Sequence, residues 1–170
     1  ALLPVYAGEG GSPPADKSLP VDYVDPFIGT TNFGTCNPGA VCPNGMMSVV
    51  PFNVMGSAEN LYDKSLLVVH DLRVPHNFFT GFAHGALSGV GCPELGALPT
   101  MTTAGELDVD YRHYGSAYSD ETVSPGYYAA TLDRYGIRAE AAATPRTSVE
   151  RYTFPKGTGR ILENTVNLTQ

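Results

Sequence analysis

The sequence of 170 residues has no tryptophan, no cluster of basic residues and no long apolar run. A helix that spans a bilayer needs about 20 consecutive apolar residues, so we expect no membrane span. The 10 lysine and arginine residues are outnumbered by 17 acidic ones, which gives a net charge of −7. Because nucleic acids and anionic membrane surfaces are bound by clustered positive charge, we expect neither as a partner.

Cysteine is also scarce, with Cys36, Cys42 and Cys92 as the three copies. No C-x-x-C pair is present, so the cysteines lack the spacing of a zinc site. Two interpretations stay open: buried or free thiols, or a bridge between Cys36 and Cys42. The cysteines therefore do not define the redox compartment of the protein.

Long helices are disfavoured by the 19 glycines and 14 prolines, which are scattered along the chain. Alternating apolar and polar residues, or short apolar runs, are separated by Pro, Gly and Asp turn signals. They predict strands at 46–52, 106–111, 127–132, 137–143, 149–154 and 160–168. Short strands at such regular spacing predict an all-β fold, an antiparallel β-sandwich.

The chain is divided into a tether and one domain. Residues 1–20, rich in Gly, Ser and Pro from residue 7 onward, are interpreted as a flexible N-terminal tether, and residues 21–170 as one β-sandwich domain. Residues 29–45 are expected to form a structured loop, and 57–74 favour a strand slightly over a helix. The N-terminus lacks the basic start and apolar centre of a signal peptide, so an export signal was removed or never existed.

Three segments carry motifs of unusual density. The first contains VDPFIGT at 24–30, NPGA at 37–40 and PNGMMSVVP at 43–51. The second is GFAHGALSGVGCPELG at 81–96, and the third contains ETVSPGYY at 121–128, followed by RYTFP at 151–155. In this order the segments resemble the N-terminal domain of glycoside hydrolase family 92, whose best-known members are calcium-dependent, exo-acting α-mannosidases.

The resemblance implies a division of labour between two domains. In the family the β-sandwich packs on a larger barrel of paired helices, and the sugar pocket opens where they meet. The catalytic carboxylates and the calcium ligands belong mostly to the barrel, so we expect no catalytic residue and no calcium site in this chain. The expected partners are terminal mannose of glycans and the C-terminal helical barrel of the same exported protein.

The loops 30–45 and 81–96 are expected to lie side by side, facing the barrel. From them we select six candidate substrate-binding residues: Asn37, Gly39, Phe82, His84, Cys92 and Glu94. A polar contact at the pocket rim is expected for His84, and Glu94 either binds a sugar hydroxyl or ties down its loop. A role in forming a turn is the simpler interpretation of Asn37 and Gly39.

The second motif departs from the family pattern at four positions. Ala83 replaces a serine, Gly85 a threonine, Ala86 a second histidine and Glu94 an aspartate, so the sugar preference on the leaving-group side is expected to differ from that of the common α-1,2-mannosidases.

One pair of carboxylates has a spacing close to that of an inverting glycosidase. Asp108 and Asp110 would stand roughly 7 Å apart on one face of a strand, near the 6.5–9.5 Å that such enzymes need. The alternating residues Leu107, Val109 and Tyr111 are expected to be buried, which leaves the aspartates on a solvated face, where nothing would hold one of them protonated. Two alternatives to an enzyme part are a free-standing carbohydrate-binding module and an adhesin-like structural domain.

Overall fold

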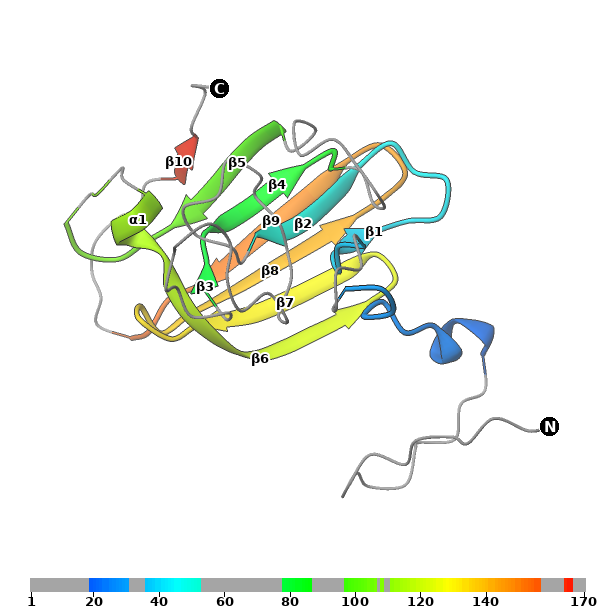
Figure 1. The fold of residues 1–170 in the computed structure, drawn as a ribbon, viewed down its shortest axis with the longest axis horizontal. Coiled ribbons are helices and arrows are strands. Elements are labelled where there is room, and N and C mark those ends of the chain that lie inside the picture. Colours follow the sequence, from blue (N-terminus) through cyan, green and yellow to red (C-terminus); the bar gives the residue numbers. More distant parts are fainter. Residues whose placement is uncertain are drawn as a thin grey trace, which may run out of the picture.

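The structure, a computed structural model, describes residues 19–30, 36–52, 78–86, 97–106, 108, 111–156 and 164–166. Within these ranges the chain forms two five-stranded sheets (Figure 1), in which every pair of neighbouring strands is antiparallel. The predicted antiparallel β-sandwich is confirmed. Residues 1–18 of the tether expected at 1–20, and the strand expected at 57–74, lie outside the described residues.

The first sheet has the strand order β1-β2-β4-β5-β10. Its strands are β1 (Ala40–Val41), β2 (Ser48–Phe52), β4 (Gly81–His84), β5 (Ala97–Thr102) and β10 (Asn164–Val166). The second sheet has the order β3-β6-β7-β8-β9. Its strands are β3 (Phe78–Phe79), β6 (Ser116–Ser124), β7 (Tyr127–Leu132), β8 (Ile137–Ala143) and β9 (Ser148–Thr153).

Alternation between more buried and more exposed residues is clearest in β8 and β9 of the second sheet. Along β8 buried and partly exposed residues alternate without exception, because successive side chains of a strand point to opposite faces. Tyr128, Ala130 and Leu132 of β7 face the same interior. A two-residue turn, Pro125-Gly126, joins the paired ends of β6 and β7, with Gly126 at a φ of 77° that glycine adopts without strain.

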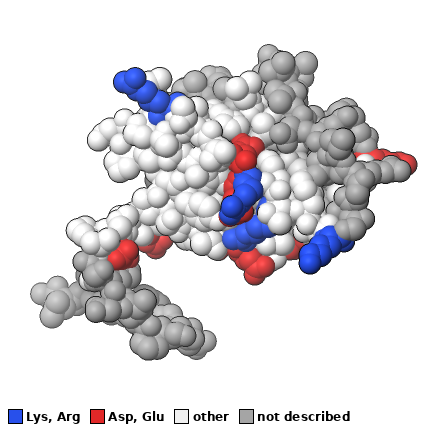
Figure 2. Space-filling view, turned by 180° about the vertical axis from the view of Figure 1, so that it is seen from behind, with Lys and Arg blue, Asp and Glu red and all other residues white. Residues whose placement is uncertain are grey.

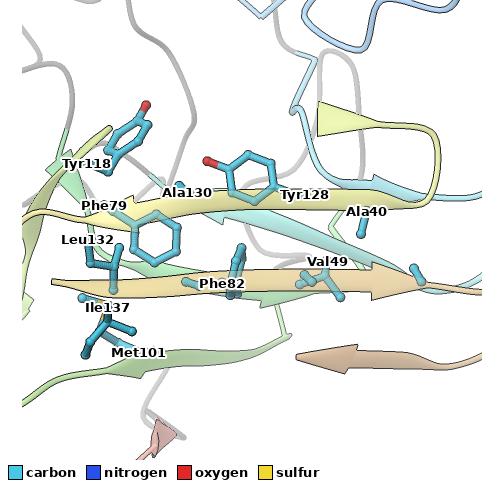
Figure 3. Close-up of a cluster of buried hydrophobic side chains, with 13 residues drawn as sticks. Ala40, Val49, Phe79, Phe82, Met101, Tyr118, Tyr128, Ala130, Leu132 and Ile137 are labelled. Carbon is cyan, nitrogen blue, oxygen red and sulfur yellow. The ribbon is translucent and has the colours of Figure 1, made fainter. Parts of the chain in front are cut away.

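The core fills the space between the two sheets and centres on aromatic rings (Figure 3). Phe82 packs edge-on against Phe79 at 5.1 Å and against Tyr128 at 5.7 Å between ring centroids. The buried Tyr128 hydroxyl donates to Glu121 Oε1 at 2.7 Å, so its polar end is satisfied. These rings join residues of both sheets into one hydrophobic cluster.

The strand expected at 106–111 is wrong at each of its described residues. Glu106 and Asp108 belong to no strand, and Tyr111 begins a one-turn helix, α1 (Tyr111–Tyr114). Leu107, Val109 and Asp110 lie outside the described residues. Side chains of the turn after β7 bond to the end of α1: Arg134 donates to His113 O, and the Tyr135 hydroxyl donates to Tyr114 O at 2.6 Å. These two carbonyls therefore have partners without a neighbouring strand.

A second one-turn helix, η1 (Pro20–Tyr23), precedes the first motif at the N-terminal side of the sandwich (Figure 1). No helix among the described residues is long and apolar enough to cross a bilayer.

Candidate functional site

The first and third motifs meet at one end of the sandwich. Gly126 N donates to Val41 O at 2.9 Å, and Met46 N donates to Pro145 O at 2.8 Å. The Cys42 thiol donates to Ala143 O at 3.0 Å. These bonds fasten the loop after β1 to the ends of β6, β7 and β8, so segments about 80 to 100 residues apart in sequence form one surface.

A cavity of about 830 Å³ opens at this end. Its walls come from η1 and the residues that follow it, from the loop 36–46, from the residues just after β4 and from the Pro125 turn. Most of the lining is apolar: Pro20, Val21, Val24, Pro26, Ile28, Val41, Pro43, Met46, Val50, Ala86 and Pro125. Among these, Met46 is 81% exposed and Ile28 73% exposed. Concentrated apolar exposure of this kind marks a surface that binds another protein or a ligand.

Described parts of the two predicted loops border the same cavity. Asn37 and Gly39 of the first loop and Gly85 and Ala86 of the second line it. Strand β2 lies between them: Gly85 N donates to Ser48 O at 2.9 Å, and the Ser48 hydroxyl donates to Ala86 O at 3.1 Å. The expected shared surface is confirmed for these residues. Residues 81–84 form β4, and 31–35 and 87–96 are outside the described residues.

Asn37 and Gly39 have different roles at the cavity. A Cβ at Gly39 would stand 2.5 Å from Val49 O and 2.8 Å from Val50 Cγ1. Glycine is therefore required here by the close approach of β1 to β2, whatever the ligand. Asn37 is partly exposed at the cavity wall, and its contact with a sugar stays a prediction.

Phe82 is not a sugar contact in this fold. Its side chain has no exposed surface and stands at the centre of the aromatic core. The two-residue period of β4 turns Phe82 toward the second sheet. Its inclusion among the substrate-binding residues is therefore wrong, and its role is packing.

His84 lies two residues further along β4 and faces the same interior. Its Nδ1 is 2.9 Å from Leu98 O, and its Nε2 is 2.7 Å from Glu150 Oε1. Because a carbonyl and a carboxylate only accept hydrogen bonds, this geometry favours an imidazole that is protonated at both ring nitrogens. The hydrogen bond to Glu150 raises the pKa of His84, against the opposing effect of burial.

Glu150, on β9, belongs to a polar cluster that also contains Thr100 and Tyr152. Its carboxylate accepts from Thr100 Oγ1 at 3.1 Å and from the Tyr152 hydroxyl at 2.6 Å. Burial would raise the pKa of Glu150, but the hydrogen bonds from His84 and Tyr152 outweigh it and hold the pKa below its usual value. Burial and the Glu150 charge together raise the pKa of Tyr152.

The sequence did not indicate Glu150. It lies 66 positions after His84 and on the other sheet. The available signal was the two-residue alternation along β9, which places Glu150 and Tyr152 together on the inward face.

Cys36 and Cys42 carry free thiols in the structure, so the alternative of a bridge between them is not realised. Both border the cavity. Cys92 and Glu94 lie outside the described residues, and their contact with substrate stays a prediction.

The carboxylates and metal ligands of a hydrolytic centre are not assembled in the described part of the chain. Asp108 Oδ2 pairs with His113 Nδ1 at 3.3 Å, and both side chains are well exposed. The expected position of Asp108 on a solvated surface is thus confirmed. Asp110 is outside the described residues. No three His, Cys, Asp or Glu residues within the described ranges are grouped so that they could hold a metal ion.

The fold and the site together define an all-β domain, an antiparallel sandwich with a mostly apolar cavity at one end. Residues 23–169 match the sequence profile of the glycosyl hydrolase family 92 N-terminal domain. The chain belongs to this family.

Three relatives are much longer than this chain. A family GH92 α-mannosidase from Bacteroides thetaiotaomicron, also solved with mannoimidazole, is 31% identical with a TM-score of 0.64, over 79% of this chain and 18% of that one. A GH92 inverting mannosidase from the same species is 25% identical with a TM-score of 0.60, over 81% and 18%.

An uncharacterized secreted glycosidase from Arthroderma benhamiae is 32% identical over 143 residues, which are 78% of this chain and 17% of that protein. The chain spans less than a fifth of the length of each of these relatives.

Proposed function

We propose that this chain is the N-terminal domain of an exported, calcium-dependent exo-α-mannosidase and that its cavity-bearing end helps to form the sugar pocket at an interface with a catalytic helical barrel. The observation that carries the proposal is the exposed apolar lining of the cavity, built from the family's own motifs. Such a surface suits a permanent contact with another domain, since the buried centres of permanent interfaces are apolar.

Terminal α-linked mannose is the proposed substrate. Two of the solved relatives are mannosidases, and one of them was solved with mannoimidazole. The relative from Arthroderma benhamiae, a secreted glycosidase, supports export. Asn37 on the cavity wall, with Cys92 and Glu94 from the loop after β4, are the residues of this chain that we propose to face the sugar.

Within the described residues no three His, Cys, Asp or Glu side chains are grouped so that they could hold a metal ion. Our proposal assigns calcium to the catalytic barrel and gives this domain no step of the reaction. Its contribution is to orient the substrate, which lowers the entropic part of the barrier.

The proposal is tested on the full-length natural protein with α-1,2-mannobiose, α-1,2-glucobiose as the matched control, and each reaction repeated with a calcium chelator. We expect release of mannose only, and loss of that activity when calcium is removed. Release of glucose at a comparable rate would contradict the substrate, and chelator-resistant release of mannose would contradict the dependence on calcium.

A further inference from the structure

The end of β4 and the start of β5 are joined by His84. Strand β4 ends at His84, and β5 begins at Ala97, which is its partner in the sheet. His84 Nδ1 lies 2.9 Å from Leu98 O, so the histidine also bonds to the strand beside it. Gly85 and Ala86, which follow His84, border the cavity.

Leu98 is held in an unusual conformation beside His84. The register of β4 with β5 shifts between Phe82 and His84, so that two steps along β4 match three along β5. Within this bulge Leu98 has a φ of 49° and a side chain that is 54% exposed. A left-handed conformation is strained for a residue other than glycine, so it persists only where neighbouring groups hold it.

The same histidine also connects the end of β4 to the other sheet. Its Nε2 contacts Glu150 on β9, and Glu150 is held in turn by Thr100 of β5 and Tyr152 of β9. The side chains of His84 and Glu150 are only 17% and 13% exposed. In the sheet, Val49 of β2 lies on the other side of His84 as an apolar neighbour, so Glu150 is the charged group that faces it among the described residues.

We infer that His84 is a positioning residue: as a doubly hydrogen-bonded cation it fixes the end of β4 to β5 and to β9, and so holds Gly85 and Ala86 in place at the cavity without touching the sugar. The inference rests on the proposed function for what the cavity binds. It replaces the rim contact expected from the motif, because both ring nitrogens are already engaged with protein acceptors.

The ion pair of His84 and Glu150, called the clasp from here on, stabilises the fold only within a defined pH window. The pKa of His84 is raised above 6.5, so its contribution to stability is complete below 6.5 and is lost as the pH rises through the raised value. The pKa of Glu150 is lowered below 4.5, so its contribution is present above 4.5 and is lost as the pH falls through the lowered value. The clasp is therefore strongest in mildly acidic solution.

The charge state of His84 is tested first on the 170-residue chain by following its two ring ¹⁵N resonances between pH 5 and pH 9. We expect both nitrogens to stay protonated to a higher pH than those of an unperturbed histidine, whose pKa is 6.5. Loss of a ring proton at or below this pH would overturn the inference.

Thermal unfolding of the same chain then compares His84→Gln, Glu150→Gln and the double variant at pH 5.5 and pH 9. The wild type should lose more stability at pH 9 than either single variant, and the double variant should be no less stable than the worse single one, because contacting groups are not additive. The matched control is His113→Gln, in the exposed pair with Asp108, which should keep the wild-type pH dependence. Independent, additive losses from His84→Gln and Glu150→Gln would refute the clasp.

The positioning role is tested in the full-length enzyme. His84→Gln and Glu150→Gln should each raise KM for the mannoside about tenfold, with kcat changed less than about twofold. Both variants loosen the backbone at Gly85 and Ala86, on the same wall of the cavity. A rise in KM for His84→Gln alone would indicate direct contact of His84 with the sugar and contradict the inference. If the full-length protein cleaves no mannoside while the ¹⁵N and unfolding results hold, the proposed function fails and the clasp stands.

Discussion

Phe82 and His84 illustrate what a motif conveys at the scale of a residue. Both lie in the most informative segment of the sequence, and both face the second sheet from alternate positions of β4. One fills the centre of the core, and the other binds the carboxylate of Glu150 across the sandwich. Their positions within the motif are thus explained by packing between sheets, and only the facing sheet reveals it.

The packing role of Phe82 predicts a large loss of stability on truncation. Phe82→Ala should lower the free energy of unfolding by about 3–5 kcal/mol, since removing a buried phenyl ring leaves a cavity among Phe79, Tyr128 and Tyr152. Equilibrium unfolding of the 170-residue chain in urea measures it. Phe82→Leu, which keeps most of the volume, is the control and should cost clearly less. Equal stability of Phe82→Ala and the wild type would contradict the assignment to the core.

Gly85 has a conformation that suits glycine. Its φ is 68°, and no atom outside its chain neighbours comes within 4 Å of a Cβ built there. A β-branched residue would be strained at this φ. Glycine at position 85 therefore has a backbone reason, independent of which sugar is bound.

At the scale of elements, the second half of the sequence was predictable because alternation there is regular. The strands expected at 127–132 and 137–143 match β7 and β8 in both bounds, and 149–154 is displaced by one residue from β9. The longest strand, β6, was missed. Its outward positions are polar along most of its length and its inward ones include Ser116, so the sequence has no apolar alternation to reveal it.

The pairing of sheets was not predictable from the sequence. Contacts such as that of Met46 N with Pro145 O, or of His84 with Glu150, join segments 66 or more positions apart. The motifs did indicate that 36–45 and 81–86 share a surface. They did not indicate that this surface would be mostly apolar, because the apolar residues of η1 and its neighbours complete it.

The outer face of the second sheet carries a charged network across three strands (Figure 2). Arg151 of β9 donates to Glu140 of β8 through Nε and Nη2, both at 2.6 Å, and the Tyr127 hydroxyl of β7 donates at 2.7 Å. The hydrogen bonds from Arg151 and Tyr127 lower the pKa of Glu140 from 4.5 to about 2. The stabilisation from Glu140 is therefore present above pH 4.5 and lost as the pH falls toward 2.

Glu140→Gln should accordingly lower the melting temperature at pH 6, and the difference from the wild type should shrink between pH 4.5 and pH 2.5. The effect is expected to be modest, since Arg151 is largely exposed to solvent. Calorimetry at a series of pH values measures it. The control is Glu106→Gln, an exposed position outside the strands. A difference that is constant with pH would show that the carboxylate charge is not what stabilises the sheet.

At the scale of the whole molecule, the apolar end of the sandwich is proposed to dock on the catalytic domain. Met46→Glu places a charge on the exposed lining of the cavity. In the full-length protein it should reduce kcat/KM for mannosides at least tenfold, yet leave the melting temperature of the 170-residue chain unchanged. Val149→Glu, at an exposed apolar position on β9 outside the cavity, is the matched control. Equal effects of the two variants on the full-length enzyme would contradict docking at this end.

The central claim is that this domain shapes a sugar pocket without carrying out the chemistry. Glycoside hydrolysis needs two carboxylates in one pocket, one of them held protonated. Asp108 is exposed and paired with His113, which does not meet this requirement. The most direct measurement is the rate of aryl α-mannoside hydrolysis by the purified 170-residue chain, set beside the full-length protein at equal molar concentration. The account predicts no turnover above background by the chain and calcium-dependent turnover by the full-length protein. Turnover by the chain alone that is abolished by Asp108→Asn would contradict it.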